Sequence, residues 1–196
     1  AVVAEILRQG LEGVAIAPIR DPQAVEAMVE AGEGQQVRLA LGGKTAMPAI
    51  GLAGKPLEVS GRVERITDGE FTITGPMYTG VKTYLGRTAV LDTGRAKIVV
   101  TSRPHEPFDV GVFTHAGIDP RTLRYIMLKS RIHYRAGFRP IASHVVECGV
   151  APDRDAAGPA EHERAQGATL GEKLDDRCVL AERAEDDAEA AQGAEV

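Results

Sequence analysis

The residues best suited to bind a ligand lie in one short segment, residues 128–135, whose sequence is Leu-Lys-Ser-Arg-Ile-His-Tyr-Arg. Lys129, Ser130, His133 and Arg135 bring positive charges, a hydroxyl group and an imidazole together. We expect a strand to end and a helix to begin here, which is the usual place for ligand sites in open α/β sheets. Ser130 would cap the helix, and the helix N-terminus together with Lys129 would attract an anion. The alternative is an ordinary capped helix start with solvated surface charges.

A second polar group, Thr-Ser-Arg at residues 101–103, follows another expected strand. If that strand neighboured the strand expected over 125–128, both polar groups would line one crevice. Ser102 lacks the Gly-x-Ser-x-Gly surroundings of a nucleophilic serine. We therefore predict no catalytic residue in this chain.

The five histidines do not form a metal-ligand pattern. His105 and His115 are ten residues apart and His133 and His144 are eleven apart, whereas paired zinc ligands on one helix usually lie four apart. The two cysteines are thirty residues apart. The spacing of these residue types therefore predicts no metal site.

The sequence Gly-Gly-Lys-Thr at residues 42–45 is similar to the end of a phosphate-binding loop. The full motif needs a glycine where Arg38 stands, and Pro48 interrupts the helix that should follow. We interpret the segment as a glycine turn that leaves a strand, which argues against an ATPase.

Composition is that of an ordinary globular chain, with 43% hydrophobic and 26% charged residues among 196. No apolar run approaches the roughly 18 residues that a membrane span needs, and no secretory segment opens the chain, so we expect a cytoplasmic protein without membrane contact. Residues 1–149 hold 15 acidic and 18 basic residues, a net charge of +3. This is too little for a nucleic-acid partner.

The body of the chain alternates between helical and strand patterns. We expect a helix over residues 1–9, a strand over 13–19, a helix over 22–31 capped by Asp21, and a strand over 37–41. Strand, helix and strand in this order are typical of a parallel βαβ unit.

The middle of the chain predicts an antiparallel meander with turns at Asp68-Gly69 and at residues 92–94. The last third returns to helices and strands, which we expect at residues 108–116, 125–128, 131–138 and 141–146. The predicted fold is a three-layer α/β domain with a mixed sheet and an inserted antiparallel β-meander.

The domain is expected to cover residues 1–148, followed by an acidic tail over 149–196. All eight aromatic residues precede this tail. From residue 150 onward there are 13 acidic and 5 basic residues. So polar a segment buries too little apolar surface to offset its ordering entropy. We expect a disordered tail with some helix over residues 180–192.

Successive blocks of the sequence resemble the C-terminal domain of the microcystinase C (MlrC-type) metallopeptidases, over about residues 1–147. The block at 108–138 is the most specific, with Phe-Asp, Gly-Ile-Asp-Pro and Lys-Ser-x-x-His-Tyr-Arg in order. The other blocks are residues 19–25 (IRDPQAV), 42–44 (GGK), 68–77 (DGEFTITGPM), 85–91 (LGRTAVL) and 99–103 (VVTSR).

The resemblance implies a zinc-dependent hydrolase of peptide bonds, such as those of linearised microcystin. In that family a separate N-terminal domain, the implied partner, carries the zinc ligands, and the C-terminal domain closes over the metal to complete the cleft. Lys129, Ser130, His133 and Arg135 match the family block and are the expected contacts to the peptide substrate. A metal-bound water would attack the peptide, and Lys129 would bind a carboxylate or the developing oxyanion.

The sequence departs from the family pattern at both ends. A glycine-rich segment expected before Ala1 is absent, and the resemblance stops after Val146. A gene fragment, or a reading frame shifted near Cys148, would explain both departures. We therefore expect the substrate-cleft half of a metallopeptidase that is inactive alone. The alternative is a stand-alone module that binds a small anion at residues 129–135.

Overall fold

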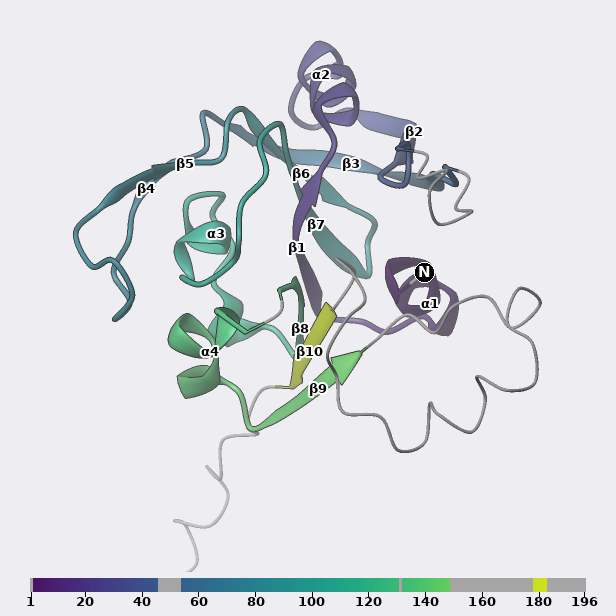
Figure 1. Cartoon of the computed structure of the whole chain (residues 1–196). Coiled ribbons are helices and arrows are strands. Elements are labelled where there is room, and N and C mark those ends of the chain that lie inside the picture. Colours follow the sequence, from purple (N-terminus) through teal and green to yellow (C-terminus); the bar gives the residue numbers. More distant parts are fainter. Residues whose placement is uncertain (1, 46–53, 131, 149–177, 183–196) are drawn as a thin grey trace, which may run out of the picture.

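The computed structural model describes residues 2–45, 54–130, 132–148 and 178–182, which form a three-layer α/β domain (Figure 1). Its described residues contain one eight-stranded mixed sheet and a separate two-stranded sheet. In order across the large sheet the strands are β2 (Gln36–Leu41), β3 (Leu57–Thr67), β6 (Thr88–Asp92), β7 (Ala96–Thr101), β1 (Val14–Arg20), β8 (Tyr125–Lys129), β10 (Cys178–Glu182) and β9 (His144–Cys148). The predicted fold class is confirmed.

Strand directions bring the carboxyl ends of five strands to one edge of the sheet. β1 runs parallel to both of its neighbours, β7 and β8. β3, β6 and β7 form an antiparallel series, so β3 runs in the same direction as β7. β10 runs antiparallel to β8 and to β9, so β9 runs in the same direction as β8. The carboxyl ends of β3, β7, β1, β8 and β9 therefore lie at the same edge, which we call the carboxyl edge.

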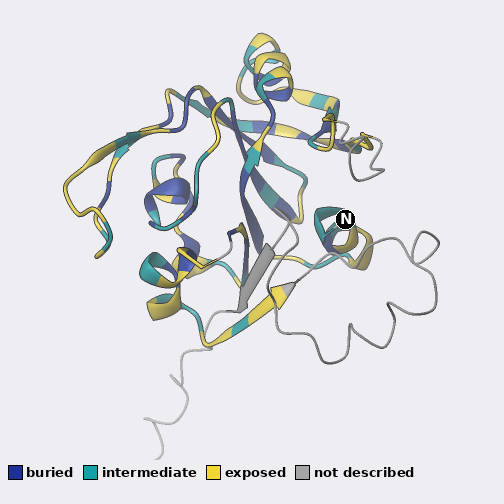
Figure 2. Cartoon of the chain, in the orientation of Figure 1, coloured by how far each residue is buried: buried dark blue, intermediate teal, exposed yellow. Residues whose placement is uncertain are grey.

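Two apolar cores lie on opposite faces of the sheet, and residues of β1 alternate between them. Most of β1 is buried (Figure 2). Val14 and Ile16 face the core covered by α1 (Val2–Gln9) and α2 (Pro22–Ala31). Ala15 and Ala17 belong to the core that includes Phe113, on the side of α3 (Gly111–Thr114) and α4 (Tyr134–Gly137). Burial on both faces explains why β1 is a continuous apolar run.

The predicted parallel βαβ unit is wrong. α2 follows β1 as expected, but β2 lies at the far edge of the sheet and pairs only with β3 among the described strands. It runs antiparallel to β3 and therefore opposite to β1. Both sides of β1 are occupied by β7 and β8, so α2 carries the chain across the sheet. The half-exposed alternation of residues 36–41 is typical of an antiparallel edge strand.

A projecting hairpin, residues 70–84, interrupts the predicted meander. β4 (Glu70–Thr72) pairs with β5 (Lys82–Tyr84), while β3 pairs with β6 and continues into the β6–β7 hairpin. Asp68-Gly69 thus turns the chain out of the large sheet, not into a neighbouring strand as expected. Gly69 has φ +79°, and a Cβ there would lie 2.0 Å from the carbonyl oxygen of Gly86. We call residues 70–84 the arm.

The two helices on the arm side are shorter than predicted. α3 covers Gly111–Thr114 and α4 covers Tyr134–Gly137, in place of 108–116 and 131–138. The Asp109 carboxylate accepts the amide of Gly111, the first residue of α3, at 2.7 Å. After α4 the chain tightens into a 3₁₀ turn at Arg139–Ile141, whose second residue is a proline. A second such turn, Pro120–Thr122, precedes β8.

β10 comes from the segment predicted to be a tail. It lies between β8 and β9 and runs antiparallel to both. Residues 180–182 are therefore strand, whereas the sequence predicted helix from residue 180. The rest of the predicted tail lies outside the described residues, and the boundary at residue 148 stays a prediction. No described helix is long and apolar enough to cross a membrane.

Candidate functional site at the carboxyl edge

Ser130 joins two segments that leave the carboxyl edge. It follows β8, is 2% exposed, and its hydroxyl donates a hydrogen bond to the carboxylate of Glu106, from the loop after β7. Nδ1 of His133 lies 3.7 Å from the same Glu106 oxygen. The side chains of Glu106 and His133 are 38% and 47% exposed, so both present polar atoms to solvent. These three residues form the Ser130 group.

The strand arrangement that would place residues 101–103 beside residues 128–135 is not present. β7 and β8 are not neighbours, because β1 separates them. The contact with Ser130 comes from Glu106, four residues beyond Ser102, as the loop after β7 crosses the end of β1. No motif distinguishes Glu106 in the sequence, so sequence reasoning missed it. Its position near two predicted site residues is a result of the tertiary structure.

The predicted helix start and its Ser130 cap are wrong, whereas anion binding at this segment stays a prediction. α4 has four residues and begins at Tyr134, too short for a helix dipole of useful size. The Ser130 hydroxyl accepts the Tyr134 amide at 3.3 Å, so it satisfies a helix donor, but His133 occupies the position before the helix. A cation at this end of β8 is supplied by Lys129, which is exposed at the end of the strand.

Arg135 lies apart from the Ser130 group in its contacts. Its guanidinium donates to the Glu147 carboxylate of β9 at 2.7 Å, and the Tyr134 hydroxyl donates to the same oxygen at 2.7 Å. Burial raises the pKa of Tyr134, and the hydrogen bond to Glu147 raises it further, so the hydroxyl stays protonated as a donor. Interaction with Tyr134 and Glu147 raises the pKa of Arg135. The contact ties α4 to β9, and a substrate role for Arg135 stays a prediction.

A second polar group closes the end of β1. Asp21 is 3% exposed and accepts hydrogen bonds from the amides of Ala24 at 3.1 Å and Gly42 at 2.8 Å and from Nζ of Lys44 at 2.9 Å. Burial acts to raise the pKa of Asp21, but the hydrogen bonds from Lys44 and the two amides outweigh it and lower the pKa. Gly42 and Gly43 have φ of 58° and 59°. The glycine-turn interpretation is confirmed, and Lys44 is bound to Asp21.

Two partly buried histidines pack at the base of the arm. The Phe71 ring lies 5.4 Å from His115 and 6.0 Å from His105. His115 Nδ1 is 2.7 Å from the carbonyl oxygen of Gly111, while the Nε2 atoms of both histidines are buried without a partner. Burial lowers the pKa of each ring, more than nearby charges and the contact with Gly111 raise it. Both rings are therefore uncharged near neutral pH.

Zinc does not fit this part of the protein. Within the ranges that the structure describes, no group of three or more His, Cys, Asp or Glu side chains could hold a metal ion. Asp109, an acidic residue that lies between the two histidines in the sequence, has its oxygens occupied by the amides of Thr74, Gly75 and Gly111. No step of chemistry through a metal follows from these residues.

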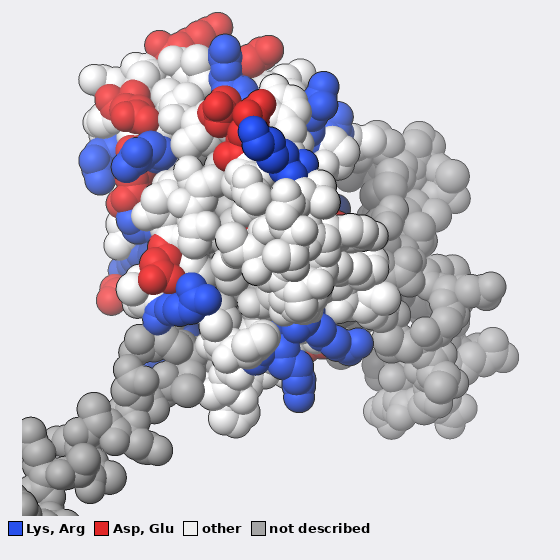
Figure 3. Space-filling model, turned by 90° about the vertical axis from the view of Figure 1, so that its left-hand side faces the viewer, with Lys and Arg blue, Asp and Glu red and all other residues white. Residues whose placement is uncertain are grey.

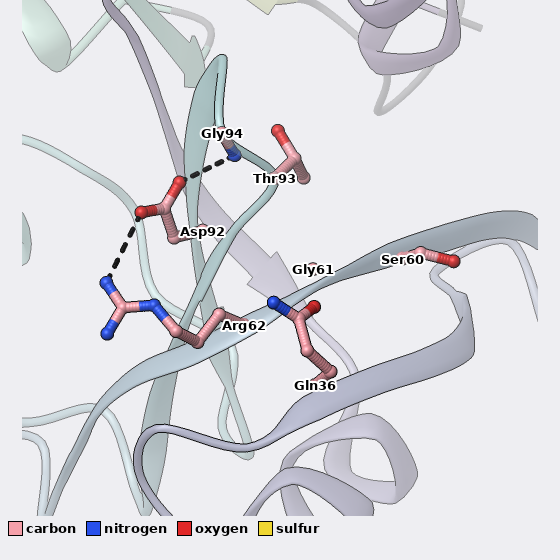
Figure 4. Close-up of a pocket in the computed structure, with 7 residues that line it drawn as sticks. All are labelled: Gln36, Ser60, Gly61, Arg62, Asp92, Thr93 and Gly94. Atoms are coloured by element: carbon pink, nitrogen blue, oxygen red, sulfur yellow. Dashed lines mark hydrogen bonds and ion pairs between the residues drawn. The ribbon is translucent and has the colours of Figure 1, made fainter.

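The hollow shown in Figure 4, of about 270 Å³, lies away from the carboxyl edge. It borders the turn from β6 to β7, at the opposite edge of the sheet. Asp92 accepts the Gly94 amide at 2.8 Å and lies 3.8 Å from Arg62, so its charge is already balanced. We conclude that it is a weaker candidate site. Its lining residues are Gln36, Ser60, Gly61, Arg62, Asp92, Thr93 and Gly94.

The fold and the comparisons together define a peptidase-related α/β domain. The chain belongs to the family described as MlrC C-terminus, whose model matches residues 1–156. It is similar to Microcystinase C from Sphingomonas sp., with 29% identity over 146 residues, which cover 74% of this chain and 27% of that protein.

A solved structure agrees with this assignment. A provisionally named metallopeptidase from Mesorhizobium sp. BNC1 is 27% identical, with a TM-score of 0.61 over 71% of this chain and 27% of that one. The chain thus spans about a quarter of the length of both relatives.

Proposed function

We propose that this chain forms the substrate-facing half of a zinc metallopeptidase cleft and acts on peptides, including linearised microcystin-type peptides. The observation that carries the proposal is the Ser130 group. It brings segments from two strand ends to the carboxyl edge and leaves Glu106 and His133 partly exposed. The names of the two relatives, a microcystinase and a metallopeptidase, supply the reaction class.

Each residue of this edge has a distinct part in the proposal. Lys129 supplies a positive charge that attracts a peptide carboxylate or a polarised carbonyl oxygen. His133 offers a ring nitrogen for a hydrogen bond to the peptide. Ser130 is too buried to reach a substrate, so it acts as a positioning residue that fixes Glu106 beside His133. Arg135 supports the same turn through Glu147.

Zinc belongs, in this proposal, to a metal-binding domain that the relatives carry outside the matching segment. The matching family model describes a C-terminus, so that domain precedes the segment in the longer proteins. The reaction needs both parts, and the cytoplasm is its proposed place. This chain binds and orients the peptide.

A peptidase assay tests the proposal directly. The purified chain is incubated with zinc and a linear peptide, alone and with the preceding part of Microcystinase C, and products are followed by mass spectrometry. We expect no cleavage by the chain alone, cleavage with both parts, and its loss on adding a chelator. Rapid cleavage by this chain alone would overturn the proposal.

Binding of a small anion by an independent module is the second candidate, and it rests on the exposed Lys129 at the strand end. Calorimetric titration with short carboxylates separates the two. The independent module is favoured by two results together. Carboxylates bind tightly to the chain alone and more weakly to Lys129→Met, and no peptide is cleaved when the preceding part of Microcystinase C is added.

A further inference from the structure

The arm carries most of the exposed apolar side chains that the structure describes. Among the described residues five large hydrophobic side chains are exposed, and three of them belong to the arm: Tyr78 (62%), Val81 (51%) and Tyr84 (46%). Single exposed apolar residues are ordinary, but a cluster on one projecting element is typical of an interaction surface. Figure 3 turns this side of the molecule toward the viewer and shows a broad area without charged side chains.

The arm is held in a fixed position, although a two-stranded hairpin alone is marginally stable in water. Its inner side packs on the body through Phe71 and Ile73, the latter 3% exposed. Asp109 accepts the amides of Thr74 and Gly75 at 3.2 and 2.6 Å. A Cβ on Gly75 would lie 2.7 Å from that carboxylate, so this approach needs glycine.

The tip of the arm is also ordered. The Ile73 amide donates to the carbonyl oxygen of Val81 at 2.9 Å, and the Gly80 amide donates to that of Ile73 at 2.9 Å. Tyr78 has φ +62° and is the only non-glycine residue with positive φ in the described ranges. Its ring lies 5.7 Å from that of Phe108 and is still 62% exposed. The exposed side chains are therefore presented by a rigid, preorganised element.

The arm is continuous with the candidate site. It leaves the carboxyl edge after β3, the same edge at which the Ser130 group lies. Arg103, from the loop after β7, lies over the Tyr84 ring at 4.8 Å, and its amide donates to the carbonyl oxygen of Leu85 at 2.9 Å. The same loop continues to Glu106. The arm and the Ser130 group therefore lie at the same edge of the sheet and are linked by one loop.

We propose that Tyr78, Val81 and Tyr84 form the docking surface for the metal-binding domain, whose matching surface is apolar and uncharged. This inference rests on the proposed function, because it names the surface through which the two halves of the cleft meet. The matched segment covers only 27% of each longer relative, and each relative therefore carries a large further part. That part is the one occupant indicated by the comparisons.

The test compares matched serine substitutions inside and outside the arm. The arm variant is Tyr78→Ser/Val81→Ser, and the control is Val146→Ser on β9, where the valine is 54% exposed against 51% for Val81. Each full-length chain is titrated calorimetrically with the part of Microcystinase C that precedes the matching segment. That partner is first shown to unfold cooperatively, and the thermal transition of each variant is compared with that of the parent chain.

We expect the parent chain and Val146→Ser to bind alike, and the arm variant to bind at least about tenfold more weakly with an unchanged thermal transition. Equal binding by all three chains overturns the docking surface and leaves the proposed function standing. Absence of binding by all three overturns the docking surface, whereas the proposed function is judged by cleavage in the peptidase assay. If the parent chain sediments as a dimer and the arm variant as a monomer, the arm binds a second copy of this chain, and docking of the metal-binding domain is overturned.

Discussion

The two polar groups at the carboxyl edge differ in how far their polar side chains are exposed to solvent. Asp21 is 3% exposed and has three donors around it, so the end of β1 is closed by internal bonds. Ser130 is equally buried, but Glu106 and His133 beside it are 38% and 47% exposed. The group after β1 therefore maintains the fold, whereas of these two groups only the one after β8 can also contact a ligand.

Asp21→Ala should have the largest effect, because it leaves the Gly42 amide and Lys44 without their acceptor and removes the helix cap. We expect the free energy of unfolding to fall by about 3 kcal/mol. Urea unfolding measures the change. Asp21→Asn is the control, since it keeps an acceptor for the cap and should cost less. A loss no larger than that of a surface substitution would remove the distinction between the two groups.

Acid should destabilise the fold through His105 and His115. Because burial lowers their pKa, the unfolded chain takes up protons below about pH 6.5 while the folded chain does not. Stability is therefore full above the unfolded pKa and decreases as the pH falls through this range. Urea unfolding at pH 7.5 and 5.5 should show the loss, and His115→Gln should reduce it. If the free energy of unfolding of His115→Gln depends on pH as strongly as that of the parent chain, burial of the His115 ring does not cause the acid effect.

Ser130→Ala should have a moderate effect. It removes the hydrogen bond to Glu106 and the acceptor of the Tyr134 amide, at a cost of about 1 kcal/mol in unfolding free energy. A double-mutant cycle with Glu106→Gln isolates the pair. If the two substitutions are simply additive, Ser130 does not position Glu106, and the group after β8 loses its central bond.

Lys129→Met should have the smallest effect on stability, within about 0.5 kcal/mol, because the side chain is exposed. With the metal-binding part present, we expect peptide cleavage to fall by about tenfold through a raised KM. Glu26→Gln, at an exposed position of α2, is the matched control and should leave cleavage unchanged. Equal cleavage by both variants would remove Lys129 from the proposed substrate contacts.

Much of the local structure was predictable from the sequence. Asp21, Pro22 and Gly32 mark the two ends of α2, because capping and chain breaking depend on adjacent residues. The turn at residues 92–94 and the apolar run of β1 were predictable for the same reason. Lys129 and Ser130 were also found at a strand end, where topology places ligand sites.

The rest could not be predicted from adjacent residues. Which strand lies beside β1 depends on β7 and β8, which lie far from it in the sequence. Glu106 joins the site only because the loop after β7 crosses the end of β1. The lengths of α3 and α4 depend on the contacts of Asp109 and on the chain turn after Gly137.

The amino-acid sequence was enough to identify the family, the alternation of helices and strands, the caps and turns, and the polar segment after β8. These properties are local, or are carried by motifs whose order along the chain is preserved. Three features became known only from the folded chain: β2 is an edge strand, the arm projects from the carboxyl edge, and Asp21 is buried while Glu106 and His133 are partly exposed. Those outcomes depend on packing between distant segments, whose free energy is not encoded at any one position.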